Sequence, residues 1–400
     1  MKKICLVSPF YPFPPVRANQ KDMVGRIGLF QELGYEVTVF AFPSPEQDFD
    51  VIADKKRHGV NVEILEKRND FISKEYRFHN IWYQSHLLLN QASFNILNNF
   101  VQQNGPDVMW YEYAALSPLA HAISKVYEGK IIFRAHNSER RHYMDKVYIN
   151  LRSNFKSALT WSYPLGLIRN IIGISKCERL MFKTAKQVAC ISKNDMVYFK
   201  RHHENAVCLP YFPPEEIVKH KNGPDKSEID VFYFGSDLKN NINRSGLDFI
   251  AKKIIPILRK KDIKFITFHI LGKNSREEYN SLDIPFLKIH GFIDDLNLFL
   301  DNMDVAIIPV FHGTGFKVKA YESLKRGFPV VASARALINF DGINGEDYFI
   351  AKKPEEFVKK LILLQDGNLR EKMGNKASKL IAEDFSKEKV MQQLESILMV

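Results

Sequence analysis

The sequence has no run of about 18 uninterrupted apolar residues, which is the length that a membrane-spanning helix needs. The apolar run behind the basic start covers only residues 4–7 and ends at Ser8-Pro9, so it predicts a first strand rather than a signal peptide. The four cysteines, at positions 5, 177, 190 and 208, form no Cys-x-x-Cys pair. A disulfide framework and a zinc site are therefore disfavoured, and we expect a cytosolic protein with free thiols.

Internal repeats of solenoid length and low-complexity tracts are also absent from the sequence. What is present is a chain of 400 residues, of which 45% are hydrophobic and 26% are charged. This composition is typical of a soluble globular protein. The length exceeds that of one ordinary core, so two domains of roughly 150–200 residues each are expected.

Strand and helix periodicities alternate along the first half of the chain. A strand over residues 3–7, a helix over 21–33 and a strand over 36–41 form the repeating unit of a parallel sheet. Prolines at positions 9, 12, 14 and 15 predict an extended loop between the first strand and the helix. Further strands are expected at residues 60–64, 108–111, 130–134 and 187–191.

A second alternation begins at Asp230, after a proline-rich and charged stretch that predicts a domain boundary. We expect two doubly wound α/β domains, residues 1–212 and 213–385, with a terminal helix over residues 386–400 that packs back on the first domain. Ligands of such sheets bind at the carboxyl ends of the strands, here the cleft between the domains. In the second domain strands are expected at residues 231–234, 265–271, 286–290, 305–309 and 330–332, and helices at 247–259, 296–302, 354–365, 368–385 and 387–399.

The segment 304–333 predicts a strand, a glycine turn, a helix and another buried strand. A glycine turn before a helix N-terminus is suited to an anion, because bare N–H groups and the positive end of the helix dipole point at it. Lys319 lies in the first helical turn, where its ammonium can reach a diphosphate, and Glu322 follows on the same face, where it can bind a ribose diol. The alternative is an ordinary loop in which Lys319 and Glu322 form a surface ion pair.

The string of residues 313–333, G-T-G-F-K-V-K-A-Y-E-S-L-K-R-G-F-P-V-V-A-S, resembles the donor-binding signature of retaining glycosyltransferases of the GT-B fold, of the large bacterial group 1, family 4-like type. Shorter matches follow in the same order over most of the chain. The resemblance implies two Rossmann-like domains facing across a cleft, and retention of anomeric configuration without a protein nucleophile. The shorter matches are Arg134-Ala135-His136-Asn137 with Glu139, Cys190-Ile191-Ser192, Phe232-Tyr233-Phe234-Gly235-Ser236 with Asn243, Ile270-Leu271-Gly272 and His290-Gly291-Phe292.

These matches give a set of predicted site residues. We predict catalytic roles for His136, Lys319 and Glu322, where His136 contacts the transferred sugar or steadies the reacting centre; the alternative is a structural histidine at a strand end. The donor is predicted to be a UDP- or GDP-sugar, and the acceptor a glycan or a lipid-linked molecule. Predicted donor contacts are Gly235, Ser236, Lys239, Arg244, Gly272, Gly313, Thr314, Gly315, Phe316 and Lys317, and predicted acceptor contacts are Arg17, Asn19, Glu112 and Asn137.

The sequence departs from the family pattern at three places. Thr314 stands where many members have a glutamate, eight residues before the ribose-binding Glu322. The first loop has residues 14–19, Pro-Pro-Val-Arg-Ala-Asn, in place of a Gly-Gly pair. The usual arginine and lysine of the second-domain phosphate loop are replaced by Ser236 and Asn243, with Lys239 and Arg244 close enough to substitute.

No Asp-x-Asp motif stands at a strand end, and Asp294-Asp295 precedes a helix that Asp295 is expected to cap. We therefore predict no essential metal and no cofactor. In that case protein cations and a helix N-terminus must neutralise the leaving diphosphate.

The net charge of +11 is unevenly distributed along the chain. Residues 146–201, here called the basic belt, contain eleven Lys and Arg residues but only Glu178 and Asp195 as acids, with aromatic and aliphatic residues interleaved. The belt can be a solvated helix face, or a surface that binds anionic lipid at the inner face of the cell membrane. Nucleic acid is disfavoured, because no nucleic-acid-binding motif accompanies the charge.

The predicted function is transfer of a hexose from a nucleotide sugar in bacterial surface polysaccharide or glycoconjugate synthesis. One rival is a nucleotide-sugar epimerase on the same fold, for which Glu112 is a candidate acid or base. The other rival is a catalytically silent scaffold in a glycan-assembly complex, which Thr314 and the altered first loop favour.

Overall fold

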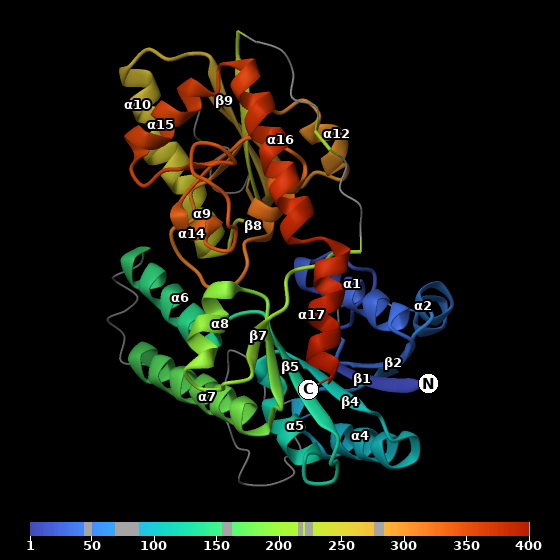
Figure 1. The fold of residues 1–400 in the computed structure, drawn as a ribbon. Coiled ribbons are helices and arrows are strands. Elements are labelled where there is room, and N and C mark those ends of the chain that lie inside the picture. Colours follow the sequence, from blue (N-terminus) through green and yellow to red (C-terminus); the bar gives the residue numbers. More distant parts are fainter. Residues whose placement is uncertain are drawn as a thin grey trace.

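The computed structural model describes residues 1–43, 50–68, 88–153, 162–214, 219–220, 227–275 and 284–399. They form two domains, one above the other in Figure 1, and each domain is built on a parallel sheet. The expectation of two doubly wound α/β domains is confirmed. Residues 154–161 of the basic belt lie outside the described residues.

The N-terminal domain contains a seven-stranded sheet in the order β3-β2-β1-β4-β5-β6-β7. Its strands are β1 Lys2–Ser8, β2 Tyr35–Ala41, β3 Asn61–Ile64, β4 Val108–Glu112, β5 Lys130–Ala135, β6 Gln187–Cys190 and β7 Ala206–Cys208. Its helices are α1 Ala18–Glu32, α2 Val51–His58, α4 Gln91–Asn104, α5 Ser117–Ile123, α6 Glu139–Ser153, α7 Ser162–Thr184 and α8 Lys193–Lys200.

The C-terminal domain contains a six-stranded sheet in the order β10-β9-β8-β11-β12-β13. Its strands are β8 Ile229–Asp237, β9 Ile266–Lys273, β10 Leu287–Gly291, β11 Val305–Ile308, β12 Val330–Ala332 and β13 Phe349–Ile350. Its helices are α9 Asn241–Phe249, α10 Ile255–Lys260, α12 Leu296–Leu300, α13 Val318–Lys325, α14 Ala334–Leu337, α15 Pro354–Leu363 and α16 Gly367–Asp384.

Two elements of the C-terminal domain differ from the sequence-based expectation. The helix expected at residues 247–259 is divided into α9, a π-helical turn at Ile250–Ile254, and α10. Pro256 lies in the first turn of α10, and its missing N–H and its ring disfavour a regular α-helix in the turn before it. Strand β11 stops at Ile308 because the next residue, Pro309, cannot donate to the ladder.

The terminal helix α17, Lys387–Met399, returns to the N-terminal domain, as the red helix in Figure 1 shows. Its residues Val390, Leu394 and Ile397 are buried in one core cluster with residues of β1, α1 and β2. Nζ of Lys130 donates to the carbonyl of Leu398 at 2.6 Å. The end of the chain therefore ties the two domains together.

Candidate active site

A glycine turn, residues 311–317, joins β11 to α13 and lies against the N-terminal domain. Gly315 has a φ of 76°, in the left-handed region that favours glycine. A Cβ added at Gly315 would lie 2.1 Å from Oδ1 of Asn137 and 2.8 Å from the carbonyl oxygen of His136. The structure thus brings the predicted donor residue Gly315 together with the predicted residues Asn137 and His136.

Carboxylates of the N-terminal domain accept hydrogen bonds from the main chain of the glycine turn. The N–H of Gly313 donates to Oδ2 of Asp145 at 2.8 Å, and the N–H of Gly315 donates to Oδ2 of Asp195 at 2.9 Å. The hydroxyl of Thr314 lies 3.4 Å from the carbonyl of Ser138. Within the predicted donor loop, the amides of Gly313 and Gly315 are thus bound to carboxylates in this conformation.

Sequence reasoning did not single out Asp145 or Asp195 as site residues. The available signal was that Asp195 is one of only two acids in the basic belt. Its side chain is buried, Oδ1 has no hydrogen bond, and Arg141 is 3.8 Å away. Burial raises the pKa of Asp195, although the N–H of Gly315 works in the opposite direction.

Two lysines of the turn and helix face the same region. Nζ of Lys317 donates to the carbonyls of Gly313 and Thr314, at 3.0 and 2.7 Å, and so closes the turn. Burial lowers the pKa of Lys317 to about 8, against the opposite effect of Asp195. The side chain of Lys317 therefore contacts the predicted donor loop itself.

Lys319 is held by neutral groups. Its ammonium lies 3.0 Å from Oδ1 of Asn243 and 3.2 Å from the hydroxyl of Tyr233, over whose ring it sits at 4.6 Å from the centroid. Burial, and secondarily the charge of Lys317, lowers the pKa of Lys319 to about 7. Among the described residues no carboxylate forms an ion pair with Lys319. The charge of the ammonium is therefore not neutralised by these residues and can attract an anion.

The carboxyl ends of β8 and β9 lie next to each other and carry several of the predicted donor residues. A Cβ at Gly272 would lie only 2.0 Å from the carbonyl oxygen of Gly235, so the two main chains meet here. Nδ2 of Asn243 donates to the carbonyl of Asp237 at 3.0 Å and holds the loop. Of the other predicted donor residues, Ser236 and Lys239 are exposed and Arg244 is partly buried on α9.

Glu322 lies one turn beyond Lys319 on α13 and is partly buried. It lines a cavity of about 480 Å³ between the domains. Asp295 caps α12 through a 3.0 Å bond from the N–H of Leu298, so its expected capping role is confirmed. The other lining residues are Lys21, Pro213, Asp294, Asp295, Leu296, Asn297 and Arg326.

Phe316, a predicted donor contact, packs into an aromatic cluster. Its ring stacks on Tyr211 with centroids 5.5 Å apart and also touches Phe340 and Phe385. The ring is therefore a packing element of the interface, which leaves the main chain of Phe316 as the part available to a donor.

His136 follows β5 and lies at the carboxyl edge of the first sheet, 7% exposed. Its Nε2 is 2.8 Å from Oε2 of Glu112, the last residue of the neighbouring strand β4. Its ring stacks on Tyr113, with centroids 4.3 Å apart and planes 10° apart. Tyr113 has a φ of 70°, which is strained for a residue with a Cβ, and such strain is frequent at active sites.

Glu112, predicted as an acceptor contact, is instead fully buried and bound to protein groups. Its Oε1 accepts from Arg26 and, at 3.0 Å, from Nε1 of Trp110. Arg26 also pairs with Asp22 at 2.7 Å, and Asp22 binds Arg134 at 3.0 Å. Burial alone raises the pKa of Glu112, but Arg26 and His136 outweigh it, so the net shift is downward.

The other predicted acceptor residues lie near the start of α1 and after β5. Arg17 is exposed at the N-terminus of α1. Asn19 is partly buried and hydrogen-bonds to Tyr113. Asn137 lies against Gly315, as described above. Asn19 therefore contacts Tyr113 of the stacked pair, and Asn137 directly follows His136.

Comparison with known proteins shows which family the second half of this chain resembles. Residues 228–366, which contain the glycine turn, both lysines and Glu322, match the family model described as glycosyl transferases group 1. Compared with curated protein sequences, the chain matches none.

Solved structures resemble the whole chain in fold. Sucrose-phosphate synthase from Thermosynechococcus elongatus aligns over 99% of this chain and 98% of its own, with 15% identity and a TM-score of 0.67. HepE from Anabaena aligns over 100% of both chains, with 12% identity and a TM-score of 0.65. A TarM variant from S. aureus aligns over 100% of both chains, with 11% identity and a TM-score of 0.66.

The chain is a glycosyltransferase of the GT-B fold. The matched residues 228–366 form the part of the glycosyltransferase that contains the predicted donor residues. His136, Glu112 and the two carboxylates on the glycine turn lie outside this match, on the opposite domain. They are placed by the structure alone.

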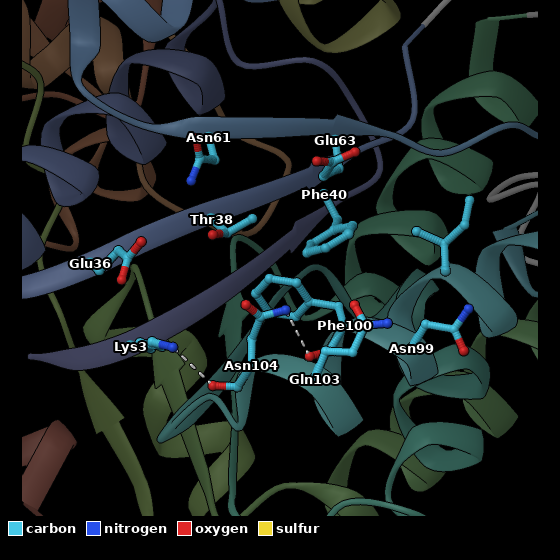
Figure 2. A pocket seen from close by; sticks show the side chains of 11 residues that line it. Lys3, Glu36, Thr38, Phe40, Asn61, Glu63, Asn99, Phe100, Gln103 and Asn104 are labelled. Atoms are coloured by element: carbon cyan, nitrogen blue, oxygen red, sulfur yellow. Dashed lines mark hydrogen bonds between the residues drawn. The ribbon is translucent and has the colours of Figure 1, made fainter.

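A second cavity of about 520 Å³ lies on the N-terminal domain of the glycosyltransferase, between β1 to β3 and α4 (Figure 2). Figure 2 shows polar side chains such as Asn61, Glu63 and Gln103 around it. None of the predicted site residues lines this cavity, so it is separate from the candidate active site.

Two searches of the described residues concern metals and membranes. No group of three or more His, Cys, Asp or Glu side chains among them is arranged to hold a metal ion. No helix within the same ranges is long and apolar enough to cross a membrane.

Proposed function

We propose that this glycosyltransferase transfers a sugar from a UDP- or GDP-sugar to a glycan or lipid-linked acceptor, with retention of configuration and without a metal. The observation on which this proposal rests is the ammonium of Lys319, which contacts only neutral groups among the described residues. An ammonium in this setting gains the most from a doubly charged diphosphate. It lies where α13 begins, at the positive end of the helix dipole.

Known ligands of the structural relatives support a nucleoside diphosphate donor. HepE structures contain UDP with glucose, and UDP-glucose, and the TarM structure contains UDP with alpha-GlcNAc-glycerol. In our proposal Glu322 accepts hydrogen bonds from the ribose, and the cavity that it lines receives the nucleoside. Lys317 and Lys319 then neutralise the phosphates as the glycosidic bond breaks, which is the task a metal performs in other transferases.

The carboxylates on the glycine turn require the donor to rearrange the interface. Asp145 and Asp195 accept the hydrogen bonds of the Gly313 and Gly315 amides in this conformation. We propose that donor phosphate or sugar hydroxyls replace one or both carboxylates. The transferred sugar then lies between the turn and the stacked rings of His136 and Tyr113.

A membrane surface is the proposed location of the acceptor. Helices α6 and α7 run side by side along the left flank of the N-terminal domain in Figure 1. On α7 the apolar side chains of Leu165, Ile168 and Ile172 are 68%, 53% and 49% exposed, and Arg169 and Lys176 lie on the same helix. Apolar side chains beside cations favour an anionic lipid surface. We place the enzyme in the cytoplasm, at the inner face of the membrane, in bacterial surface polysaccharide or glycoconjugate synthesis.

The epimerase rival depended on Glu112 as an acid or base. Glu112 is fully buried and both of its oxygens bind protein donors, so it has no access to a sugar ring in this conformation. The glycosyltransferase reading is therefore favoured over the epimerase.

A donor panel tests the proposed function. The purified protein would be incubated with UDP- and GDP-sugars, with a membrane extract as acceptor source and with excess chelator. We expect release of nucleoside diphosphate in step with glycan formation, at a rate that the chelator does not change. A new sugar nucleotide would instead indicate an epimerase, and no product from any donor would indicate a scaffold.

A further inference from the structure

The imidazole of His136 has two nitrogens in different surroundings. Nε2 lies 2.8 Å from Oε2 of Glu112, whereas no hydrogen bond to Nδ1 forms among the described residues. The stacked ring of Tyr113 fixes the plane of the imidazole. The nitrogen that stays without a protein partner is therefore the one available to a ligand.

The protonation of Nε2 follows from the partners of Glu112. Oε1 of Glu112 accepts from Arg26 and Trp110, both of which can only donate. The charge of Arg26 keeps the pKa of Glu112 below its ordinary value despite burial, so the carboxylate is ionised and can only accept. Nε2 of His136 must then be the donor, and in the neutral ring the lone pair is on Nδ1.

A network of ion pairs and hydrogen bonds holds Glu112 in its position beside His136. Glu112 is 0% exposed, and Arg26 is held on its other side by Asp22. Asp22 in turn binds Arg134, which donates to the carbonyls of Leu209 and Pro210. Two carboxylates thus face two guanidinium groups, and these four buried charges balance one another.

We propose that Glu112, clamped by Arg26 and Trp110, is a positioning residue that fixes the Nε2–H tautomer of His136 and so reserves Nδ1 as an acceptor for a sugar hydroxyl. This inference rests on the proposed function for the identity of the ligand, but not for the tautomer. Glu112 touches no substrate and acts through His136. The carbonyl of His136 lies beside Gly315, so the residue adjoins the turn that we propose binds the donor.

The variant Glu112→Gln separates tautomer control from packing, because it keeps the shape of the side chain. An amide has one oxygen for the three donors from Arg26, Trp110 and His136. When this oxygen stays with Arg26 and Trp110, the amide NH₂ faces His136. Nε2 must then accept, and the hydrogen moves to Nδ1, where it can no longer accept from a sugar.

Nitrogen-15 NMR of labelled histidine reads the tautomer directly, with the His136 signals assigned by their loss in His136→Asn. At a pH where the ring is neutral, we expect the Nε2–H form in the wild type and the Nδ1–H form in Glu112→Gln. Trp110→Phe removes one donor but no acceptor, so it should keep the Nε2–H form. An Nδ1–H wild type, or an unchanged tautomer in a folded Glu112→Gln protein, would overturn the proposal.

Kinetics give the second readout. Wrong-tautomer substitutions in catalytic histidine systems lower kcat by up to roughly 10⁴-fold, and we expect a fall of at least about tenfold in Glu112→Gln with little change in KM for the donor. Glu36→Gln, at a partly buried position of β2 outside the candidate active site, is the control with unchanged activity. Inactivity of the wild type on every donor would refute the proposed function, while the NMR result would still decide the role of Glu112. A tautomer change without loss of kcat would overturn the functional part of the inference.

Discussion

The main-chain N–H of Gly315 donates a hydrogen bond to the carboxylate of Asp195 across the domain interface, at 2.9 Å. Asp145 makes the equivalent bond to Gly313 at 2.8 Å. A helix N-terminus with free amides is an anion site, and here two side chains of the opposite domain supply the anions. In this conformation the enzyme therefore has its own carboxylates on the amides that we assign to the donor.

We predict that removing either carboxylate strengthens nucleotide binding. In Asp195→Ala and Asp145→Ala the ligand no longer has to break a hydrogen bond between the amide and a protein carboxylate. Because such a bond contributes roughly 1 kcal/mol, we expect the Kd for UDP or GDP to be about fivefold lower. Calorimetry measures this Kd. Asp341→Ala, which removes the exposed pair with Lys193 across the same interface, is the matched control. Weaker binding in both carboxylate variants would show that the carboxylates assist the donor rather than compete with it.

The lowered pKa of Lys319 predicts a pH dependence of nucleotide binding. Below pH 7 the ammonium of Lys319 is charged in the free protein, so its contribution to nucleotide affinity is at its highest. Above about pH 7 the free lysine loses its proton, which binding must restore, so affinity falls by up to roughly tenfold per pH unit. Calorimetry in buffers of different ionisation enthalpy should detect proton uptake at pH 8.

Lys319→Arg is the control for this titration, because a guanidinium stays charged over the whole range. Its affinity for UDP should change with pH only through the groups that both proteins share, which are the terminal phosphate and Lys317. An equally steep loss of affinity in Lys319→Arg would assign the titration to another group.

Glu322 is predicted to bind the ribose, and thermal unfolding can report this contact. A ligand that binds only the folded state raises Tm, so UDP at a saturating concentration should stabilise the wild type. We expect Glu322→Ala to lose most of this protection. Glu346→Ala, whose exposed carboxylate pairs with Lys376 of α16, should keep it. Equal protection of both variants would remove Glu322 from the nucleotide site.

The exposed apolar side chains of α7 predict binding to anionic vesicles. Wild-type protein should sediment with vesicles that contain phosphatidylglycerol, less at high salt, and not with neutral vesicles. Ile168→Glu places a negative charge among the contacts and should reduce binding at least about fivefold. Leu298→Glu makes the same change at a 66% exposed leucine of α12 and should have no effect. Equal binding of the two variants would favour a solvated helix face.

The sequence allowed prediction of features that depend on local pattern. The order of strands and helices, the glycine turn and the adjacent Lys319 and Glu322 all lie within short segments whose periodicity and turn residues are legible. The capping role of Asp295 is a local feature of the same kind. These are the parts of the fold and site that periodicity, turn chemistry and spacing can define.

Contacts between distant segments could not be predicted in this way. Asp145 and Asp195 meet the glycine turn only because the domains face each other, with more than one hundred positions between donor and acceptor. Glu112 looked accessible at a strand end, but Arg26 from α1 and Trp110 from its own strand bury its carboxylate. The two neutral hydrogen-bond partners of Lys319, Tyr233 and Asn243, likewise come from a strand and a helix far away in the sequence.

The most direct test of the account is turnover of the best donor by Lys319→Ala under saturating conditions. Loss of a preorganised charge on the leaving group costs about 3 kcal/mol of transition-state stabilisation, so we predict a fall in kcat of at least roughly 100-fold in a folded protein. Lys325→Ala, on the same helix α13, should retain wild-type kcat. A Lys319→Ala enzyme with near-wild-type turnover would contradict the assignment of the diphosphate to this lysine.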